Sequence, residues 1–387
     1  MNPALLIRLR PITPWRIGPD HGALDQSEAV LHSDALYSAL SLAFEQLGWL
    51  EEWLNATAGP YCPPVVRFSS CFPWQRGLLF VPPPMGLWPP PETPGAPAKL
   101  RWKGAKLVPT TVVAALLRGE TLDEKAWTVD AYSGCLIPTG GRFPTGPFRR
   151  MRRSAIAVDR VTGSNIQPWA VGCVQFAPAS GVWCAAEFAN ATAYAIWAPK
   201  LACAFRLLAD SGLGGLRSRG FGRSRTPDVQ PGTLRELLLP DFETRLSAAP
   251  AATRSWWLLS LFSPGAADKV AWGSGNYSLV ERSGRVGSRT SAGLAKKSSR
   301  LLKEGSLVVA EGALTGSVRD VAPDGASHPV WRAGFAVALE VPRKDPPAKT
   351  VAAKDAGVKA AVVPETPAPE TPAAETPAPD DAGGAAA

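Results

Sequence analysis

Short apolar runs, separated by glycine and proline, dominate the hydrophobic pattern of this chain. Such runs are typical of strands when β-branched and aromatic residues are frequent in them. They predict strands at "ALLIRLRPI" (4–12), "VVRFSSCFPW" (65–74) and "GLLFVP" (77–82). We also predict a hairpin that pairs "WAVGCVQFAP" (169–178) with "GVWCAAEFA" (181–189). Four more strands are predicted near residues 255–262, 277–282, 305–311 and 334–341.

Helical spacing is clearest where leucine and alanine recur from Leu36 to Leu47, before Gly48. Ser33 is the predicted N-cap of this helix, and Asp34 suits its positive end.

A second, shorter helix is predicted over residues 199–210. It leads into "SGLGGLRSRGFGR" (211–223), here called the glycine loop, and then into a short strand at 220–225. The order of strands and helices indicates the α+β class rather than a doubly wound sheet.

Two segments differ in composition from the rest. Residues 343–387 consist mainly of alanine, proline, threonine and acids, so we predict a disordered tail that cannot bury enough apolar area to fold. The proline-rich segment 81–97 is a predicted exposed insertion, because successive prolines interrupt helices and central strands. The chain has 387 residues and a net charge of +8, and its acidic end from Asp345 contributes −4. Residues 1–344 therefore carry +12, which favours an anionic partner.

Nothing in the sequence indicates a metal, a disulfide or a membrane segment. The six cysteines form no C-x-x-C pair, and the three histidines have no zinc-site spacing. No apolar run approaches the roughly 20 residues that span a bilayer. We therefore expect a cytoplasmic protein with no metal and no cofactor.

The glycine loop does not match two familiar phosphate-binding motifs. In a G-x-G-x-x-G register begun at Gly212, Arg217 stands where the third glycine belongs. In a P-loop register begun at Gly215, Phe221 stands where the lysine belongs. If the segment is extended, Arg217 and Arg219 point to the same side and suit successive phosphates of a nucleic acid. The alternative is a solvated turn whose glycines serve backbone geometry alone.

Three segments occur in an order that resembles the RAMP superfamily of CRISPR-Cas proteins. They are "LHSDALYSAL" (31–40), "VVRFSSCFPW" with "LLFVPPP" (78–84), and the glycine loop. "AIAVDRVTG" (155–163) and "HPVWRAGFAVALEV" (328–341) fit the same pattern. Over residues 1–342 the chain most resembles the fourth subunit of the type III-A Csm effector complex.

This resemblance implies two ferredoxin-like (RRM-like) units, one over residues 1–226 and a degenerate one over 227–342. It implies an RNA-binding scaffold, not an enzyme, that holds the repeat-derived 5′ tag of the crRNA. The implied protein partners are the large polymerase-like subunit and the repeated RAMP backbone subunit. The glycine-loop residues that the resemblance places on the RNA are Gly212, Gly214, Gly215, Arg217, Ser218, Arg219, Gly220 and Gly222, and the neighbouring Arg223 adds charge.

A second basic cluster lies in "GRFPTGPFRRMRRSAIAVDR" (141–160), where Asp159 is the one acid. The corresponding region of related subunits resembles a thumb-like hairpin, expected here over 142–168. Arginine planes and aromatic rings grip single-stranded RNA by stacking, whereas the alternative here is a flexible basic loop. The predicted RNA contacts in this cluster are Arg142, Arg149, Arg150, Arg152, Arg153 and Arg160.

His32 raises the main rival function. RAMP endoribonucleases often place a catalytic histidine near the first helix, where it can act as a general acid or base. No second catalytic group has a recognisable position, so we expect a structural or RNA-contacting role for His32 and RNA contact by Ser33. The other alternative is a purely structural bridging subunit whose arginines meet acidic protein surfaces.

Overall fold

The computed structural model describes residues 2–19, 22–59, 63–90, 104–240, 242, 253–287 and 293–342. Met1–Arg343 form one compact unit, and Lys344–Ala387 form a second unit that lies outside the described residues. The predicted disorder of 343–387 and the part of the proline-rich insertion beyond residue 90 also lie outside them. The exposure predicted for residues 81–90 is wrong, because Val81, Pro84 and Leu87 are buried and only Gly86 and Pro89 are exposed in this part.

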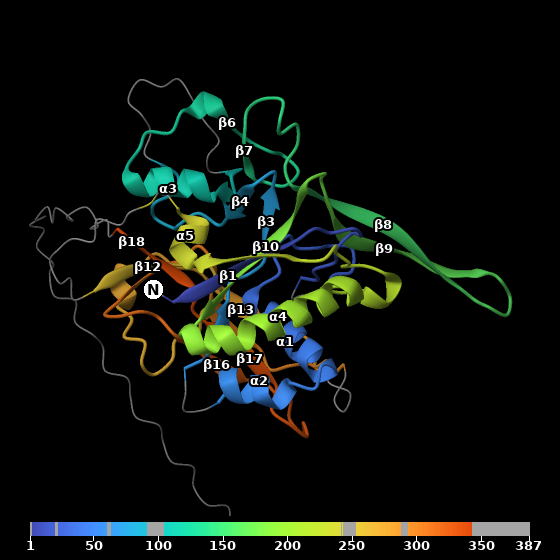
Figure 1. The fold of residues 1–387 in the computed structure, drawn as a ribbon. Coiled ribbons are helices and arrows are strands. Elements are labelled where there is room, and N and C mark those ends of the chain that lie inside the picture. Colours follow the sequence, from blue (N-terminus) through green and yellow to red (C-terminus); the bar gives the residue numbers. More distant parts are fainter. Residues whose placement is uncertain are drawn as a thin grey trace, which may run out of the picture. The chain divides into compact units, whose positions relative to one another are not determined.

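The main sheet contains seven antiparallel strands (Figure 1). Its order is β11-β1-β10-β3-β4-β5, and β2 pairs with the part of β10 that β3 leaves free. The strands are β1 (Pro3–Leu9), β2 (Val66–Phe68), β3 (Phe72–Gln75), β4 (Leu78–Val81), β5 (Val108–Pro109), β10 (Ser180–Phe188) and β11 (Asp228–Thr233).

Alternate residues of β1 face two different cores, as the period of a strand requires. Leu5 and Ile7 pack in one core, against α1, α2 and α4, which lie together on one side of the sheet in Figure 1. Ala4 and Leu6 pack in the other core, with Trp257 from the C-terminal half. The helices are α1 (Ser33–Gln46), α2 (Leu50–Thr57), α3 (Thr110–Arg118), α4 (Ala191–Ser211) and α5 (Leu234–Leu238). None of the described helices is long and apolar enough to cross a membrane.

Helix α4 is longer than predicted. Asn190 caps its start by accepting a hydrogen bond from the backbone N–H of Ala193 (2.8 Å), and Pro199 lies inside the helix rather than at its beginning. The prediction took the proline as a start, although an asparagine nine positions earlier was the stronger capping residue.

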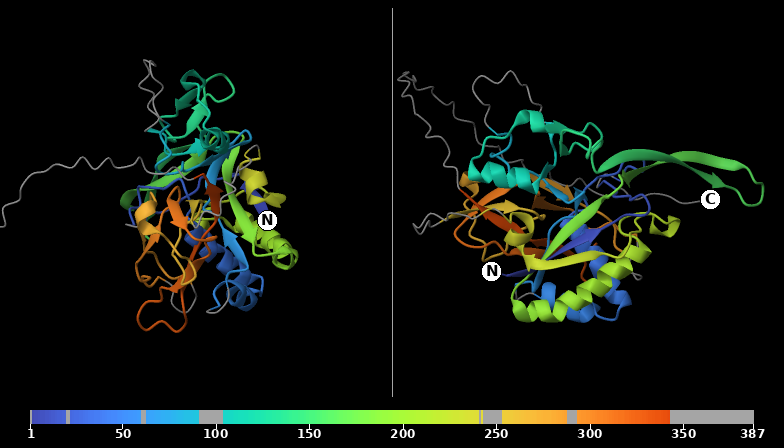
Figure 2. Two further views of the ribbon diagram at one scale, coloured as in Figure 1. Left: turned by 90° about the vertical axis from the view of Figure 1, so that its left-hand side faces the viewer. Right: turned by 45° about the horizontal axis from the view of Figure 1, so that its top comes forward.

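A long hairpin formed by β8 (Phe148–Val158) and β9 (Asn165–Phe176) extends away from the main sheet in both Figure 1 and Figure 2. The predicted pairing of 169–178 with 181–189 is therefore wrong. Strand β10 is buried along nearly its whole length and pairs with β1 on one edge and with β2 and β3 on the other. No edge of β10 remains for β9, so β9 pairs with β8.

The C-terminal half contains a three-stranded sheet of order β15-β12-β18 and two further two-stranded ladders. These strands confirm the α+β class and the four strands predicted there. The ladder partners β14, β16 and β17 were not predicted. The strands of this half are β12 (Arg254–Leu258), β13 (Leu279–Arg282), β14 (Ser299–Leu302), β15 (Leu307–Ala310), β16 (Gly316–Asp320), β17 (Trp331–Phe335) and β18 (Ala338–Val341). A separate small ladder joins β6 (Trp127–Val129) to β7 (Leu136–Pro138). The unit boundary placed after residue 226 stays a prediction, and β11, just beyond it, belongs to the main sheet.

The start of α1 joins the two halves through buried hydrogen bonds. Ser33 is the first helical residue, not the predicted N-cap, and His32 in the capping position makes no side-chain cap bond. The Ser33 hydroxyl instead accepts from the N–H of Leu261 (3.0 Å). Ser70 accepts from the N–H of Ser33 (2.8 Å) and donates its own N–H to the carbonyl of Leu259 (2.9 Å). The serine is thus used to bind the C-terminal half, so it cannot cap the helix.

Two buried groups of charges lie at the same joint. Asp34 receives two hydrogen bonds of 3.1 Å from Arg282 on β13, and Arg332 on β17 lies 3.7 Å away. His32 Nδ1 lies 2.7 Å from Glu304, and its Nε2 lies 3.4 Å from Glu28. Asp34 thus pairs with two charges from the C-terminal half, and His32 pairs with one, Glu304.

The His32 group predicts a pH-dependent stability. Burial disfavours the charged imidazole, yet the carboxylates of Glu304 and Glu28 raise the pKa of His32 to about 10. A folded-state pKa above the ordinary value of 6.5 means that this stabilisation is complete below pH 6.5 and is lost as the pH rises through about 10. We expect the free energy of unfolding of the native protein to fall by at most about 1.4 kcal/mol per pH unit over this window. Urea denaturation at pH 6.5 and 9.5 measures it.

Two variants make this pH prediction specific. His32→Gln should have a shallower pH slope than the native protein, whereas His328→Gln, at a half-buried histidine whose Nδ1 lies 2.9 Å from the carbonyl of Pro329, should keep the native slope. Equal slopes in all three proteins would contradict the prediction.

Candidate nucleic-acid interface

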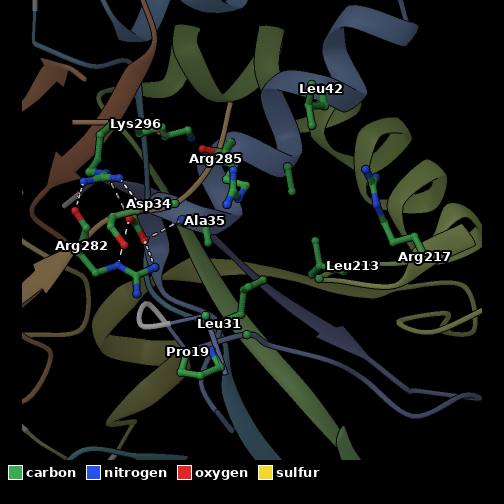
Figure 3. Close-up of a pocket in the computed structure, with 18 of the residues that line it drawn as sticks. Pro19, Leu31, Asp34, Ala35, Leu42, Leu213, Arg217, Arg282, Arg285 and Lys296 are labelled. Carbon is green, nitrogen blue, oxygen red and sulfur yellow. Dashed lines mark hydrogen bonds and ion pairs between the residues drawn. The ribbon is translucent and has the colours of Figure 1, made fainter. Parts of the chain in front are cut away.

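A cleft of about 610 Å³ opens between the glycine loop, α1 and the C-terminal half. Figure 3 shows Leu213 and Arg217 on one side of this glycine-loop cleft and Arg282 and Lys296 on the other, where Asp34 lies beside Arg282. The loop, the first helix and the strand ladders of the C-terminal half are far apart in sequence, and only the completed fold brings them together.

The glycine-loop cleft is positively charged. Its cationic side chains are Arg217, Arg282, Arg285, Lys296 and Arg332. Asp34 is the one carboxylate among the described lining residues, and it pairs with Arg282 and Arg332. Five cations against one carboxylate leave an excess of four positive charges, and Arg217, Arg285 and Lys296 are the cations that Asp34 does not pair with.

The pKa of Lys296 is consistent with this excess of positive charge. Burial and the guanidinium of Arg332 lower the pKa of Lys296, with Arg282 acting in the same direction and Asp34 opposing them. When an anion enters the cleft, it stabilises the charged form of a lysine that neighbouring cations destabilise. The electrostatics of the cleft thus favour a polyanion such as a nucleic-acid backbone.

The glycine loop is held by hydrogen bonds within the chain. The N–H of Gly215 donates to the carbonyl of Arg16 (2.7 Å), and the N–H of Gly222 donates to the carbonyl of Pro14 (2.9 Å). The N–H of Leu213 donates to the carbonyl of Gly222 (3.0 Å). These donors are occupied, so side chains, more than the loop backbone, are available for phosphate.

Positive φ angles explain the glycines of the loop. Gly212, Gly214, Gly220 and Gly222 have φ values of +92°, +94°, +80° and +84°. A Cβ atom would lie 2.4 Å from the carbonyl oxygen of Phe221 if added to Gly212, 2.5 Å from that of Arg16 if added to Gly214, and 2.2 Å from that of Leu213 if added to Gly222. A Cβ atom on Gly220 would have no neighbour within 4 Å. Three of these glycines therefore allow close packing of the chain on itself, and Gly220 alone faces open space.

The predicted extended conformation of the arginine segment is wrong. The segment forms a 3₁₀ helix, η3 (Arg217–Arg219), in which residues two apart point in different directions. Arg217 lines the cleft, and the exposed Ser218 follows it. The guanidinium of Arg219 instead lies 5.5 Å from the ring centroid of Trp169 on β9. Positive φ angles on both sides of the segment, at Leu216 and Gly220, do not allow an extended run.

The short strand predicted at 220–225 is also wrong. Ser224 makes a single bridge with Pro11, and the next strand is β11. Arg223 is exposed, and its Nε donates to the carbonyl of Asp210 (3.1 Å) at the end of α4.

The basic hairpin lies beside the glycine loop at its base. The guanidinium of Arg153 on β8 lies 6.0 Å from the ring centroid of Phe221, and Arg152 forms an exposed ion pair with Asp25 (3.0 Å). The predicted hairpin over 142–168 is thus present as β8 and β9, with the residues before Phe148 forming turns. The six arginines predicted to contact RNA there are all exposed: Arg142, Arg149, Arg150, Arg152, Arg153 and Arg160.

His32 and Ser33 do not line the glycine-loop cleft. Both are buried at the joint described above, and both ring nitrogens of His32 face carboxylates. Since the raised pKa keeps this imidazole protonated near neutral pH, it is poorly placed to accept a proton from RNA. Among the described residues, no group of three or more His, Cys, Asp or Glu side chains is arranged to hold a metal ion.

Four cations of the cleft were missed in the sequence analysis: Arg282, Arg285, Lys296 and Arg332. The segments "ERSGRVGSR" (281–289) and "LAKKSSR" (294–300) are basic, and this was the available indication. Their distance in sequence from the glycine loop hid the relation, because pairing by β13, β14 and β17 brings them to it.

One family model and several solved structures are similar to this chain. Residues 251–341 match the CRISPR Csm4 C-terminal domain. A search of curated proteins finds no match. Among solved structures, a chain of the Csm3-Csm4 subcomplex in the type III-A CRISPR-Cas interference complex is similar at 15% identity and a TM-score of 0.57, covering 88% of this chain and 100% of that one. A chain of the Csm1-Csm4 cassette in complex with cA4 is similar at 17% identity and a TM-score of 0.51, covering 89% and 100%. At these identities the likeness shows a shared fold.

Proposed function

We propose that this Csm4-like chain is an RNA-binding subunit of a type III CRISPR-Cas effector complex, in which it holds the 5′ tag of the crRNA. The observation that carries the proposal is the glycine-loop cleft, where Arg217, Arg285 and Lys296 provide positive charge that the protein itself does not neutralise. The resemblance to the fourth Csm subunit agrees with the family match over 251–341 and with the shared fold.

The strand order supports the ferredoxin-like character of the first unit. Counting β2 and β3 as one interrupted strand, the chain runs β1, α1, β2/β3, β10, α4, β11, and the sheet order is β11-β1-β10-β2/β3. A β-α-β-β-α-β succession with both helices on one face is the ferredoxin-like arrangement. The smaller sheet β15-β12-β18 is our candidate for the degenerate second unit.

The proposed protein partners follow from the relatives. Solved structures of similar fold are named as complexes of Csm4 with Csm3 and with Csm1. We propose that this chain contacts the corresponding subunits of its own complex. The exposed arginines of the β8–β9 hairpin are the proposed additional grip on the RNA, beside Arg219 and Trp169.

We propose a scaffold role rather than catalysis. His32, the candidate for an endoribonuclease, is buried between two carboxylates and does not line the glycine-loop cleft. A general acid or base has to reach the reacting hydroxyl within hydrogen-bond distance, directly or through one water.

The salt dependence of RNA binding tests the proposed site. Arg217→Ala/Lys296→Ala removes two of the three cleft cations that Asp34 does not pair with. Each phosphate contact on a single strand contributes about −0.7 to the slope of log K against log salt. Fluorescence anisotropy with a labelled single-stranded RNA should show weaker binding and a slope shallower by roughly 1.4.

A matched control is Arg254→Ala/Lys269→Ala, which removes the same charge at exposed ion pairs with Glu340 and Glu311. This variant should keep most of the native affinity and slope. If the salt slope becomes shallower by the same amount in both double variants, Arg217 and Lys296 act only through the net charge of the protein. The cleft is then not the RNA site.

A further inference from the structure

A second cavity, of about 570 Å³, is independent of the glycine-loop cleft, since no residue lines both. We call it the Lys303 cavity. It lies between the turn before α1, the segment after β4, the base of the β8–β9 hairpin and the C-terminal half. Its lining includes Glu28, His32, Met85, Trp88, Lys106, Phe148, Arg150, Ser278, Val280, Lys303 and Glu304.

The Lys303 cavity carries excess positive charge. Its carboxylates, Glu28 and Glu304, both face the protonated His32. Lys106, Arg150 and Lys303 add three cations, so four positive groups stand against two negative ones. Glu304 is held further by a hydrogen bond from Ser70, which leaves it little capacity to neutralise a lysine.

The three added cations come from different elements. Lys106 precedes β5, Arg150 belongs to β8, and Lys303 follows β14. Arg150 is fixed in place by donating its Nε to the carbonyl of Ser27 (3.2 Å). Both lysines are exposed. Lys303 is near enough to Glu28 to help lower the pKa of that carboxyl, but the nearer partner of Glu28 is His32. An anion in this cavity would be approached from three directions.

The rest of the wall is apolar and partly aromatic. Met85, Trp88, Phe148 and Val280 line it, and the N–H of Met85 donates to the carbonyl of Gly305 (2.9 Å), which ties this wall to the C-terminal half. The hydroxyl of Ser278 is buried and has no hydrogen-bond partner among the described atoms. A ligand that carries a polar edge beside a flat apolar body would satisfy both features.

We propose that the Lys303 cavity binds a nucleoside phosphate, with the phosphate on Lys106, Arg150 and Lys303 and the base against the wall of Met85, Trp88 and Val280. The cavity volume falls within the roughly 300–1,000 Å³ of ordinary small-molecule sites. A free nucleotide and a nucleotide turned out of a bound RNA strand share this chemistry. The inference does not depend on RNA binding at the glycine-loop cleft.

Calorimetric titration of the full-length protein with AMP at low salt tests the site. Lys106→Ala/Lys303→Ala should weaken AMP binding at least tenfold, because it removes two charge-assisted contacts. Lys125→Ala/Lys269→Ala makes the same change of charge at exposed lysines outside the cavity and should bind AMP like the native protein. Val280→Phe fills the cavity without changing charge and should also weaken binding.

The proposal is overturned if the native protein binds no AMP, or if both double variants lose the same affinity. It is also overturned if inorganic phosphate competes as well as AMP does, since the base would then contribute nothing. Arg217→Ala/Lys296→Ala should leave AMP affinity unchanged, which separates this site from the glycine-loop cleft.

A second titration identifies the source of the nucleotide. If excess single-stranded RNA expels AMP, and the Lys106→Ala/Lys303→Ala variant also binds RNA more weakly, the cavity takes a nucleotide of the RNA strand. If AMP and RNA bind together without competition, the cavity takes a free nucleotide. Both outcomes support a nucleoside-phosphate site.

Discussion

Asp34→Asn should destabilise the protein by about 3–5 kcal/mol, the range measured when one partner of a buried ion pair is removed. Asp34 and Arg282 are both less than a tenth exposed, and the two side chains share two hydrogen bonds of 3.1 Å. Burial alone would favour the neutral acid, but Arg282, with His32 and Arg332, lowers the pKa of Asp34, so the carboxylate is charged when folded. The asparagine would leave two buried guanidiniums without their counter-charge. Urea denaturation at pH 7 measures the change.

Asp228→Asn is the matched control. Its carboxylate pairs with Arg8 at 3.3 Å but is 48% exposed, so water screens the pair and the loss should stay below about 1 kcal/mol. A similar loss in both variants would mean that the joint at the start of α1 does not hold the two halves together.

Gly222→Ala should destabilise the protein by about 3 kcal/mol or more and weaken RNA binding with it. A left-handed backbone costs an alanine roughly 1–2 kcal/mol, and overpacking adds about 1–3 kcal/mol. The added Cβ would lie 2.2 Å from the carbonyl oxygen of Leu213. This backbone oxygen can move away only if the glycine loop itself moves. Thermal unfolding and RNA anisotropy on the same preparation provide the two measurements.

Gly220→Ala measures the cost of a left-handed backbone without the steric overlap expected at Gly222. Its φ is also positive, at +80°, but its new Cβ would meet nothing within 4 Å. The loss should therefore be limited to about 1–2 kcal/mol. Equal losses at Gly220 and Gly222 would show that backbone conformation alone, without internal packing, determines the need for glycine here.

Local patterns predicted the fold more fully than the site. The first strand, the helix after Ser33 and the C-terminal strands followed from hydrophobic spacing, which depends on neighbours along the chain. The strand that pairs with β9 could not be predicted from the neighbouring sequence. Both edges of β10 are already paired with β1, β2 and β3, so β9 pairs with β8. In the same way, the 3₁₀ helix at Arg217–Arg219 depends on the left-handed residues on either side of it.

The sequence predicted the residues on only one of the two sides of the glycine-loop cleft. Arg217 and the glycines were found from composition, whereas Arg285 and Lys296 come from a region whose relation to the loop is set by tertiary pairing. His32 illustrates the opposite error. A histidine beside the first helix suggests chemistry, but the carboxylates of Glu28, four residues earlier, and of the distant Glu304 give it a buried structural role.

The joint at the start of α1 also has a consequence for synthesis on the ribosome. Asp34 is translated early, but its partners Arg282 and Arg332 emerge almost 250 and 300 residues later. Until then the first helix begins with a carboxylate that has no cation, and the glycine loop has only one wall of its cleft. The nascent chain therefore acquires both walls of the glycine-loop cleft only after β17 has left the ribosome. Under the proposed function, a guide RNA would bind finished chains in preference to truncated ones.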